Sequence, residues 1–113
     1  MKKNVTREEF TEFLDKLTAR EEKVLHTKGV DYTRYAREEN VLENFDRIAD
    51  ELSTTTKEVI WIYMCKHLHA LLSYVKYGTL LQSEDLSERI IDIRNYAALM
   101  AVEAWRRDEL NLV

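Results

Sequence analysis

The sequence predicts an all-α protein, a bundle of about four helices with a long helix at its C-terminal end. The chain of 113 residues has no proline and two glycines, whereas a β-rich fold of this length needs many tight turns. Hydrophobic residues make up 45% of the chain, which is enough for one core. Apolar residues recur at helical spacing in four stretches. We therefore expect one helical domain over residues 1–113, with residues 1–5 frayed.

The first predicted helix begins at Thr6, which forms a capping box with Glu9. Its apolar face, interrupted at Glu21, carries Phe10, Phe13, Leu14, Leu17, Val24 and Leu25. Gly29 is typical of a helix C-terminus, so we expect the helix to end at about Thr27. Residues 30–39 have no clean period and are interpreted as a connecting segment.

The second predicted helix is short and runs from about Asn40 to Leu52. Asn40 is a fair N-cap because its side chain can accept a hydrogen bond from the first helical turn. The apolar face consists of Val41, Leu42, Phe45, Ile48, Ala49 and Leu52. Asp46 and Asp50 lie one turn apart elsewhere on the helix, so it can offer carboxylates to a neighbouring helix.

The third predicted helix begins at Thr55, which makes a second capping box with Glu58, and runs to about Lys76. Residues 59–75 are apolar on nearly every side, which is typical of a central helix covered by its neighbours. A lysine and two histidines interrupt this apolar run, so we predict a buried helix and not a membrane span.

The fourth predicted helix runs from an N-cap at Ser83 to about Arg107. Its apolar residues alternate at spacings of four and three, and the expected seam against a partner helix is Leu86, Ile90, Ile93, Ala97, Met100 and Ala104. A second apolar side carries Ile91, Ala98, Leu99 and Val102. Because a small monomer has little reason for two apolar sides, we expect a homo-oligomer, a dimer or higher.

A row of polar side chains lies opposite that seam. Glu84, Glu88, Asp92 and Asn95 share this side of the helix at intervals of about one turn. Carboxylates placed in this way can share Mg²⁺, which in turn bridges the phosphates of a nucleotide. The alternative is a solvated acidic face, which is the usual role of such a row.

His67 lies on the apolar stripe of the third predicted helix. One interpretation is a core histidine that hydrogen-bonds to a single partner. The other pairs it with Asp92 or Asn95 across the third and fourth helices, so that the imidazole can donate to a phosphate or a base. Lys66 beside it could supply a cation to an anionic ligand, or could lie with its stem along the surface.

Arg89 and Tyr96 complete the set of candidate ligand-binding residues. Arg89 is placed beside Asp92 and Asp85 and could orient them. An aromatic face beside an arginine can sandwich a base, although core and interface filling is the simpler role for most aromatic residues here. The sequence contains no Gly-rich phosphate loop, nucleophile elbow, zinc motif or recognisable triad.

Charge and cysteine content narrow the classes of function. A net charge of −4 gives no support for general nucleic-acid binding. The single cysteine, Cys65, allows no disulfide within one chain and suits a reducing cytosol. The sequence shows no signal peptide, so we expect a cytoplasmic protein.

Several short motifs resemble a pattern that recurs in small, mostly uncharacterised phage proteins. A lysine-histidine pair on one helix precedes a Ser-Glu-…-Arg-Ile-x-Asp-x-x-Asn-Tyr helix. The matching residues are Asn44-Phe45, Lys66-His67, Ser83-Glu84, Arg89-Ile90, Asp92 and Asn95-Tyr96. The resemblance covers residues 40–105. It implies a phage protein that is located in the cytoplasm of an infected bacterial host.

More distantly, the layout is similar to the all-α nucleoside triphosphate pyrophosphohydrolases of the MazG type. This resemblance implies helical carboxylates that hold Mg²⁺, cleavage between the α and β phosphates, and a dimer or tetramer. Asp92-x-x-Asn95 stands where a Glu-x-x-Asp type of motif is expected. The departure weakens the case for catalysis more than the case for nucleotide binding.

Three functions therefore stay open. The first is binding of a phosphate-bearing nucleotide between the third and fourth helices, which would sequester a host defence signal. Its ligand-binding residues would be Lys66, His67, Arg89, Asp92, Asn95 and Tyr96. The second is an Mg²⁺-dependent MazG-like pyrophosphohydrolase whose metal ligands would be Glu84, Glu88 and Asp92. The third is a non-enzymatic helical interaction protein, and neither it nor the first needs a cofactor.

Overall fold

The computed structural model describes residues 4–32, 40–79 and 85–112 of the chain, without the side chains of residues 25–32. These residues contain four α helices and no strand, so the prediction of an all-α bundle is confirmed. The helices are α1 (Arg7–Tyr32), α2 (Glu43–Glu51), α3 (Thr56–Tyr77) and α4 (Leu86–Arg106). None of the described helices is long and apolar enough to span a membrane.

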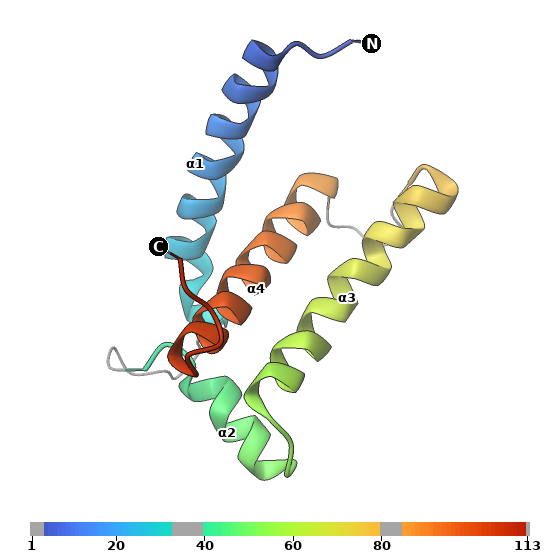
Figure 1. Cartoon of the computed structure of the whole chain (residues 1–113). Helices are drawn as coiled ribbons and strands as arrows, with labels where there is room; N and C mark the ends of the chain where they lie inside the picture. Colours follow the sequence, from blue (N-terminus) through green and yellow to red (C-terminus); the bar gives the residue numbers. More distant parts are fainter. Residues whose placement is uncertain (1–3, 33–39, 80–84, 113) are drawn as a thin grey trace.

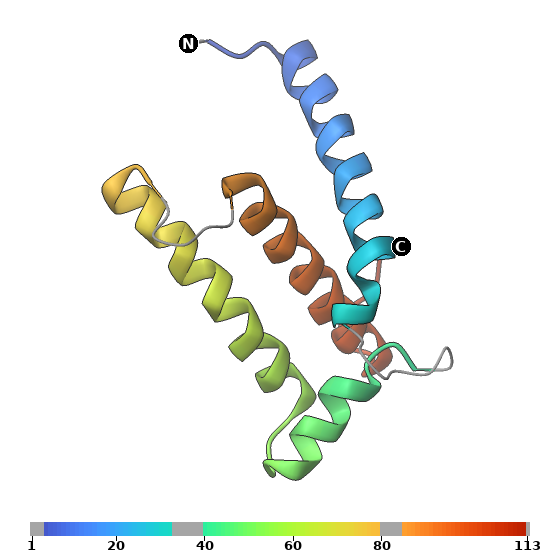
Figure 2. The ribbon, with the colours of Figure 1, turned by 180° about the vertical axis from the view of Figure 1, so that it is seen from behind.

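The central helix is α4 and not α3. Figure 1 shows α4 between α1 and α3, with α2 at one end of α3, and the view from behind in Figure 2 shows the same order. Helix α3 contacts α4 and α2, and α1 contacts α4, but the described residues make no contact between α1 and α3. The expectation that the third helix is covered on several sides is therefore wrong, because α1 packs on α4 instead.

The hydrophobic core lies where α2, α3 and α4 meet. Its buried members are Leu42, Phe45, Ala49, Val59, Ile60, Met64, Tyr96 and Leu99. Ile48, Leu68 and Met100 pack against them and are partly buried. An isolated helix of nine residues is unstable in water, so α2 depends on this packing and not on its own helix propensity.

The predicted caps of α1 and α3 are confirmed. The backbone N of Glu9 donates to Oγ1 of Thr6 at 3.1 Å, and the backbone N of Thr6 donates to Oε1 of Glu9 at 3.3 Å, as in a capping box. At α3 the backbone N of Glu58 donates to Oγ1 of Thr55 at 3.3 Å. Gly78 ends α3 with a φ of 74°, a left-handed conformation that glycine adopts without a steric penalty.

Two predicted helix ends are wrong. Helix α1 continues through Gly29 to Tyr32. One glycine inside a long helix costs only about 1 kcal/mol relative to alanine, which is too little to end it. The N-cap of α4 is Asp85, whose Oδ1 accepts a hydrogen bond from the backbone N of Glu88 at 2.9 Å. Ser83, the predicted cap, lies outside the described residues.

Helix α2 also begins later than predicted. It starts at Glu43, and Leu42 takes the N-cap position without a side-chain cap. Asn40, the predicted cap, holds the preceding turn, because its Oδ1 accepts a hydrogen bond from the backbone N of Leu42 at 3.0 Å. Asparagine side chains often stabilise such a turn in competition with a helix.

Helix α4 turns its polar row, and not its predicted apolar seam, toward α3. The buried residues of α4 are Arg89, Ile91, Asp92, Asn95, Tyr96, Leu99 and Glu103. None of the six predicted seam residues is fully buried, and Ala97 is exposed. The reason is His67, which lies in the buried stripe of α3 beside Met64 and requires polar partners from the facing helix.

Candidate functional site

Five polar or aromatic side chains gather in the interface of α3 and α4. Helix α3 contributes His67, and α4 contributes Arg89, Asp92, Asn95 and Tyr96 from successive turns. We call these five residues the α3/α4 polar cluster. All five are buried, and Arg89 and Asn95 retain 1% and 0% of their accessible surface. The structure thus brings together five of the six residues that the sequence nominated for ligand binding.

A contact between His67 and Arg89 lies at the centre of the cluster. Nη1 of Arg89 is 3.0 Å from Nδ1 of His67. A guanidinium has donors and no acceptor, so Nδ1 of the imidazole accepts this hydrogen bond. The proton of a neutral ring then resides on Nε2, because an imidazole protonated at Nδ1 would oppose the arginine.

Asp92 balances the positive charge of Arg89. Oδ2 of Asp92 lies 3.6 Å from Nδ1 of His67, which is too long for a hydrogen bond. The predicted pairing of His67 with Asp92 across the two helices is therefore present as a close approach. With a neutral His67, the cluster buries one positive and one negative side chain, and their charges cancel.

Tyr96 connects the cluster to the core and to the surface. Its ring stacks on His67 with centroids 5.4 Å apart, and on Tyr63 with centroids 6.3 Å apart. Phe45 of α2 meets Tyr63 edge to face at 5.8 Å. Because Tyr63 is exposed, this aromatic row runs from the interior of the α3/α4 interface to the protein surface.

The cluster fixes how α4 packs on α3. A shift of α4 along α3 would separate Arg89 from His67 and leave the buried guanidinium without this hydrogen bond. Leaving a buried donor unsatisfied costs about 1–3 kcal/mol, and more for a charged group. A ligand that reached Arg89 would have to part the two helices and replace this contact.

Lys66, the sixth nominated residue, does not join the cluster. It is exposed while its neighbour His67 is buried. A step of one residue turns a helix by about 100°, which directs Lys66 away from the side of α3 that carries His67. The structure therefore leaves Lys66 in contact with solvent, where it takes no part in the contacts of Arg89 or Asp92.

Of the three predicted metal ligands, the structure describes Glu88 and Asp92. Glu84 lies outside the described residues, Glu88 is half-buried and Asp92 belongs to the α3/α4 polar cluster. Within residues 4–32, 40–79 and 85–112, no group of three or more histidine, cysteine, aspartate or glutamate side chains could hold a metal ion. The Mg²⁺ site remains a prediction that depends on the position of Glu84.

Asp46 was a candidate second-helix ligand for that metal, but it has another role. Its carboxylate accepts hydrogen bonds from Nη1 of Arg106 at 3.0 Å, Oγ1 of Thr56 at 2.6 Å and Nδ2 of Asn40 at 3.1 Å. It therefore joins α2 to the start of α3 and to the end of α4. Arg106 holds the pKa of the Asp46 carboxyl well below its usual range, and Asp46 raises the pKa of Arg106.

Glu103 extends this network and was missed by the sequence reasoning as a buried residue. Its carboxylate is 1% exposed and accepts hydrogen bonds from Nε of Arg106 at 2.7 Å and from Nε of Arg107. The spacing of three and four residues indicates these pairs, although we had expected them at the surface. The contact between Asp46 and Arg106 has no such signal in the sequence, because the two residues lie 60 positions apart.

A separate ion pair attaches α1 to α4. Nε of Arg94 donates to Oε2 of Glu21 at 2.6 Å, and both side chains are partly buried. Glu21 interrupts the apolar face of α1 in the sequence, and the structure explains this interruption by the arginine opposite it. The pair makes the position of α1 along α4 specific, since apolar contacts alone tolerate sliding.

Comparison of the chain with protein-family models, curated proteins and solved structures finds no match. The resemblances to small phage proteins and to MazG-type pyrophosphohydrolases therefore remain expectations from short motifs. Function has to be argued from the described residues alone.

Proposed function

We propose that this protein is a non-enzymatic helical interaction protein that assembles with copies of itself through the apolar faces of α1 and α3. The observation that carries the proposal is the exposure of large apolar side chains on both helices. Phe10 and Phe13 of α1 are 57% and 65% exposed, and Trp61 and Val75 of α3 are 52% and 71% exposed. Apolar surfaces of this kind on soluble proteins mark interaction sites.

The shape of the chain supports an assembly. Its radius of gyration is 16.1 Å, whereas a compact domain of this length has about 13 Å. The first half of α1 extends past the beginning of α4 in both ribbon views (Figures 1 and 2). We call residues 7–16 the α1 arm. A chain that leaves such an arm uncovered buries less apolar surface than its length allows, and a second chain can supply the missing contacts.

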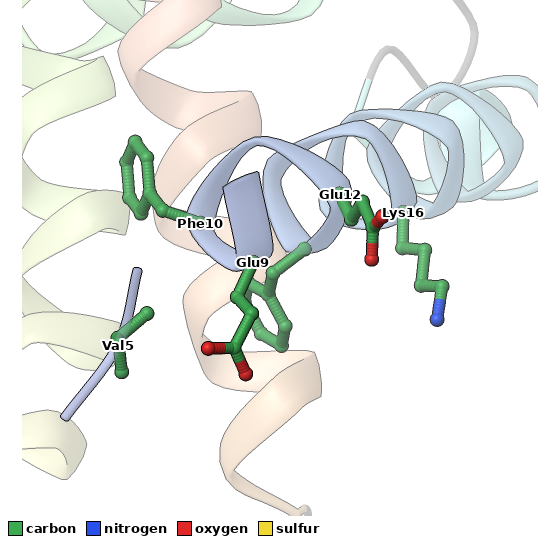
Figure 3. Close-up of a pocket in the computed structure, with 6 residues that line it drawn as sticks. Val5, Glu9, Phe10, Glu12 and Lys16 are labelled. Carbon is green, nitrogen blue, oxygen red and sulfur yellow. The ribbon is translucent and has the colours of Figure 1, made fainter. Parts of the chain in front are cut away.

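The α1 arm also carries a surface hollow. Figure 3 shows the hollow beside the first turns of α1, where its walls come from one helix and the residue before it. It has a volume of about 550 Å³ and is lined by Val5, Glu9, Phe10, Glu12, Phe13 and Lys16. A hollow with two phenylalanines, open on its outer side, suits apolar side chains from a partner helix.

A second candidate function is the binding of a phosphate-bearing nucleotide at the α3/α4 polar cluster. The convergence of an arginine, a histidine and an asparagine on one interface favours it. The burial of Arg89 and its bond to His67 oppose it, because the ligand would have to replace that contact. Pyrophosphate release with Mg²⁺ and sequestration of a host signal remain predictions from the resemblances.

Thermal unfolding distinguishes the two candidates in one assay. The melting temperature is measured over a dilution series of the protein, and then with a panel of nucleotides with and without Mg²⁺. Self-assembly predicts that the melting temperature rises with protein concentration, since association stabilises the folded chain. Nucleotide binding predicts a rise with nucleotide at a fixed protein concentration.

Matched variants test whether the dependence of the melting temperature on protein concentration arises from the α1 arm. Phe13→Ser should weaken the dependence on protein concentration, whereas Thr11→Ser, at an exposed position of the arm outside the lining of the hollow, should preserve it. A melting temperature that is independent of protein concentration contradicts the proposal. Stabilisation by a nucleotide in the absence of any concentration dependence would favour the second candidate instead, and analysis of the recovered nucleotide would separate binding from cleavage.

A further inference from the structure

Helices α1 and α3 carry the same spacing of side chains along one side. On α1 the steps of four and three residues run through Phe10, Leu14, Leu17, Glu21 and Val24. On α3 the same steps run through Trp61, Cys65, Leu68, Leu72 and Val75. We call these two rows the α1 seam and the α3 seam. Alternating steps of four and three are the repeat by which two helices interlock in a coiled coil.

The α1 seam is an established interface along only part of its length. Leu17, Glu21 and Val24 are partly buried where α1 lies along α4, and Glu21 forms the ion pair with Arg94. Phe10 and Leu14 continue the same row into the α1 arm and are exposed. The open end of the seam is therefore continuous with a surface that already packs on a helix.

The α3 seam is open within the same chain at Trp61, Leu72 and Val75, which are exposed. Cys65 and Leu68 between them are partly buried, and Leu68 packs against the core. The described residues of α1 and α3 make no contact, and α4 lies between the two helices (Figure 1). The two seams match in spacing, yet the arrangement of one chain keeps them apart.

Charge favours contact between the two kinds of helix over contact between like helices. The α1 arm holds four acidic and two basic residues, namely Glu8, Glu9, Glu12, Asp15, Arg7 and Lys16. Helix α3 holds three lysines and one glutamate, namely Lys57, Lys66, Lys76 and Glu58. An arm against an arm, or α3 against α3, would bring like charges together, whereas an arm against α3 brings opposite charges together.

We propose that two copies of this chain exchange their α1 arms, and that Phe10 and Leu14 of each copy pack into the α3 seam of the other. This inference rests on the proposed self-assembly and adds which surfaces meet. Exchange in both directions gives a closed dimer in which the same two surfaces are used twice. It also covers the exposed apolar side chains of the α1 arm and of α3 in a single symmetric interface.

Disulfide trapping tests this arrangement, because Cys65 is the single cysteine of the chain and lies in the α3 seam. Phe10→Cys and Leu14→Cys are prepared separately and oxidised mildly with diamide. We expect a covalent dimer on a non-reducing gel, with the introduced thiol joined to Cys65 of another chain and the bond identified by peptide mass spectrometry. The dimer should be lost when Cys65→Ser is added, and Glu8→Cys, on the side of the arm away from Phe10 and Leu14, should give much less of it.

The other products of this experiment contradict the exchange in distinguishable ways. A wild-type dimer joined through Cys65 of both chains would place α3 against α3. A dimer of Leu14→Cys that persists with Cys65→Ser would place arm against arm. Either result overturns the exchange and leaves self-assembly intact. A bond that forms within one chain overturns it as well, and a wild type that is monomeric and forms no crosslink with any variant removes both the exchange and the proposed function.

Discussion

Nη1 of Arg89 lies 3.0 Å from Nδ1 of His67, inside the interface between α3 and α4. This contact places a positive charge where the hydrophobic pattern predicts apolar packing. It therefore accounts for the orientation of α4, which turns Arg89 and Asp92 inward and leaves its row of isoleucines and alanines only partly buried. The α3/α4 polar cluster then specifies how the helices pair, and its removal should lower the free energy of unfolding.

The acceptor that His67 offers to Arg89 should matter more than the ring itself. His67→Leu fills the space but removes the acceptor, and we expect it to lower the free energy of unfolding by about 2–3 kcal/mol. His67→Asn keeps an oxygen near the position of Nδ1 and should cost less, although it leaves a gap beside Tyr96. Urea unfolding of both variants measures the difference. Equal stability of His67→Leu and the wild type would show that the contact contributes nothing.

Arg89 and Asp92 should behave as a coupled pair. Arg89→Met leaves the carboxylate of Asp92 buried without its partner charge, and we expect a loss of about 3–5 kcal/mol. The double variant Arg89→Met with Asp92→Leu buries no charge and should recover most of that loss. A double-mutant cycle by urea unfolding gives the interaction energy directly. Additive effects of the two substitutions would contradict a shared cluster.

Asp46 should make stability depend on pH in the acid range. Its pKa is lowered in the folded state, chiefly by Arg106, so its contribution is complete above the usual pKa of 3.8. The contribution is lost as the pH falls below that value toward the lower folded-state pKa. Asp46→Asn should therefore cost about 1–2 kcal/mol at neutral pH. The difference between the variant and the wild type should shrink in acid.

The matched control for this measurement is Asp50→Asn. Asp50 is exposed and lies one turn from Asp46 on the same helix. Its substitution should change stability little at either pH. If Asp50→Asn changed the stability with the same pH dependence as Asp46→Asn, the hydrogen bonds of Asp46 with Thr56 and Arg106 would not be the cause of the pH dependence.

Helix content could be predicted because it depends on local spacing, but only part of the apolar core could. Phe10 and Phe13 of the first predicted apolar face and Leu52 of the second are exposed. The apolar face of α2 supplies Phe45 and Ala49 to the core as expected, and Thr55 caps α3 as expected. Helix ends were less predictable. A glycine stops a helix only where the chain also turns, and Gly29 lies in a stretch that continues as helix.

The membership of the candidate site was predictable, but its orientation was not. The expected pairing of His67 across the two helices is present with Asp92, and Tyr96 stacks on the same imidazole. Helical spacing left open whether the polar row faces water or His67, because a hydrophobic pattern by itself favours water for polar residues. A histidine in the buried stripe of α3 is the signal that reverses this preference, since a buried imidazole requires polar partners.

Two ion pairs between distant parts of the sequence could not be predicted. Arg106 meets Asp46 across 60 residues, and Arg94 meets Glu21 across 73. Each pair depends on how the helices pack, which periodicity does not encode. The interruption of the α1 seam at Glu21 is visible in the sequence, but its partner is not.

The molar mass of the protein in solution tests self-assembly most directly. Size-exclusion chromatography with light scattering is run on the wild type at a series of micromolar concentrations, beside Phe13→Ser and its control Thr11→Ser. We predict a mass of two chains of 13.5 kDa for the wild type and for Thr11→Ser, with a shift toward one chain for Phe13→Ser. A wild type that elutes as a single chain of 13.5 kDa at every concentration would contradict the account.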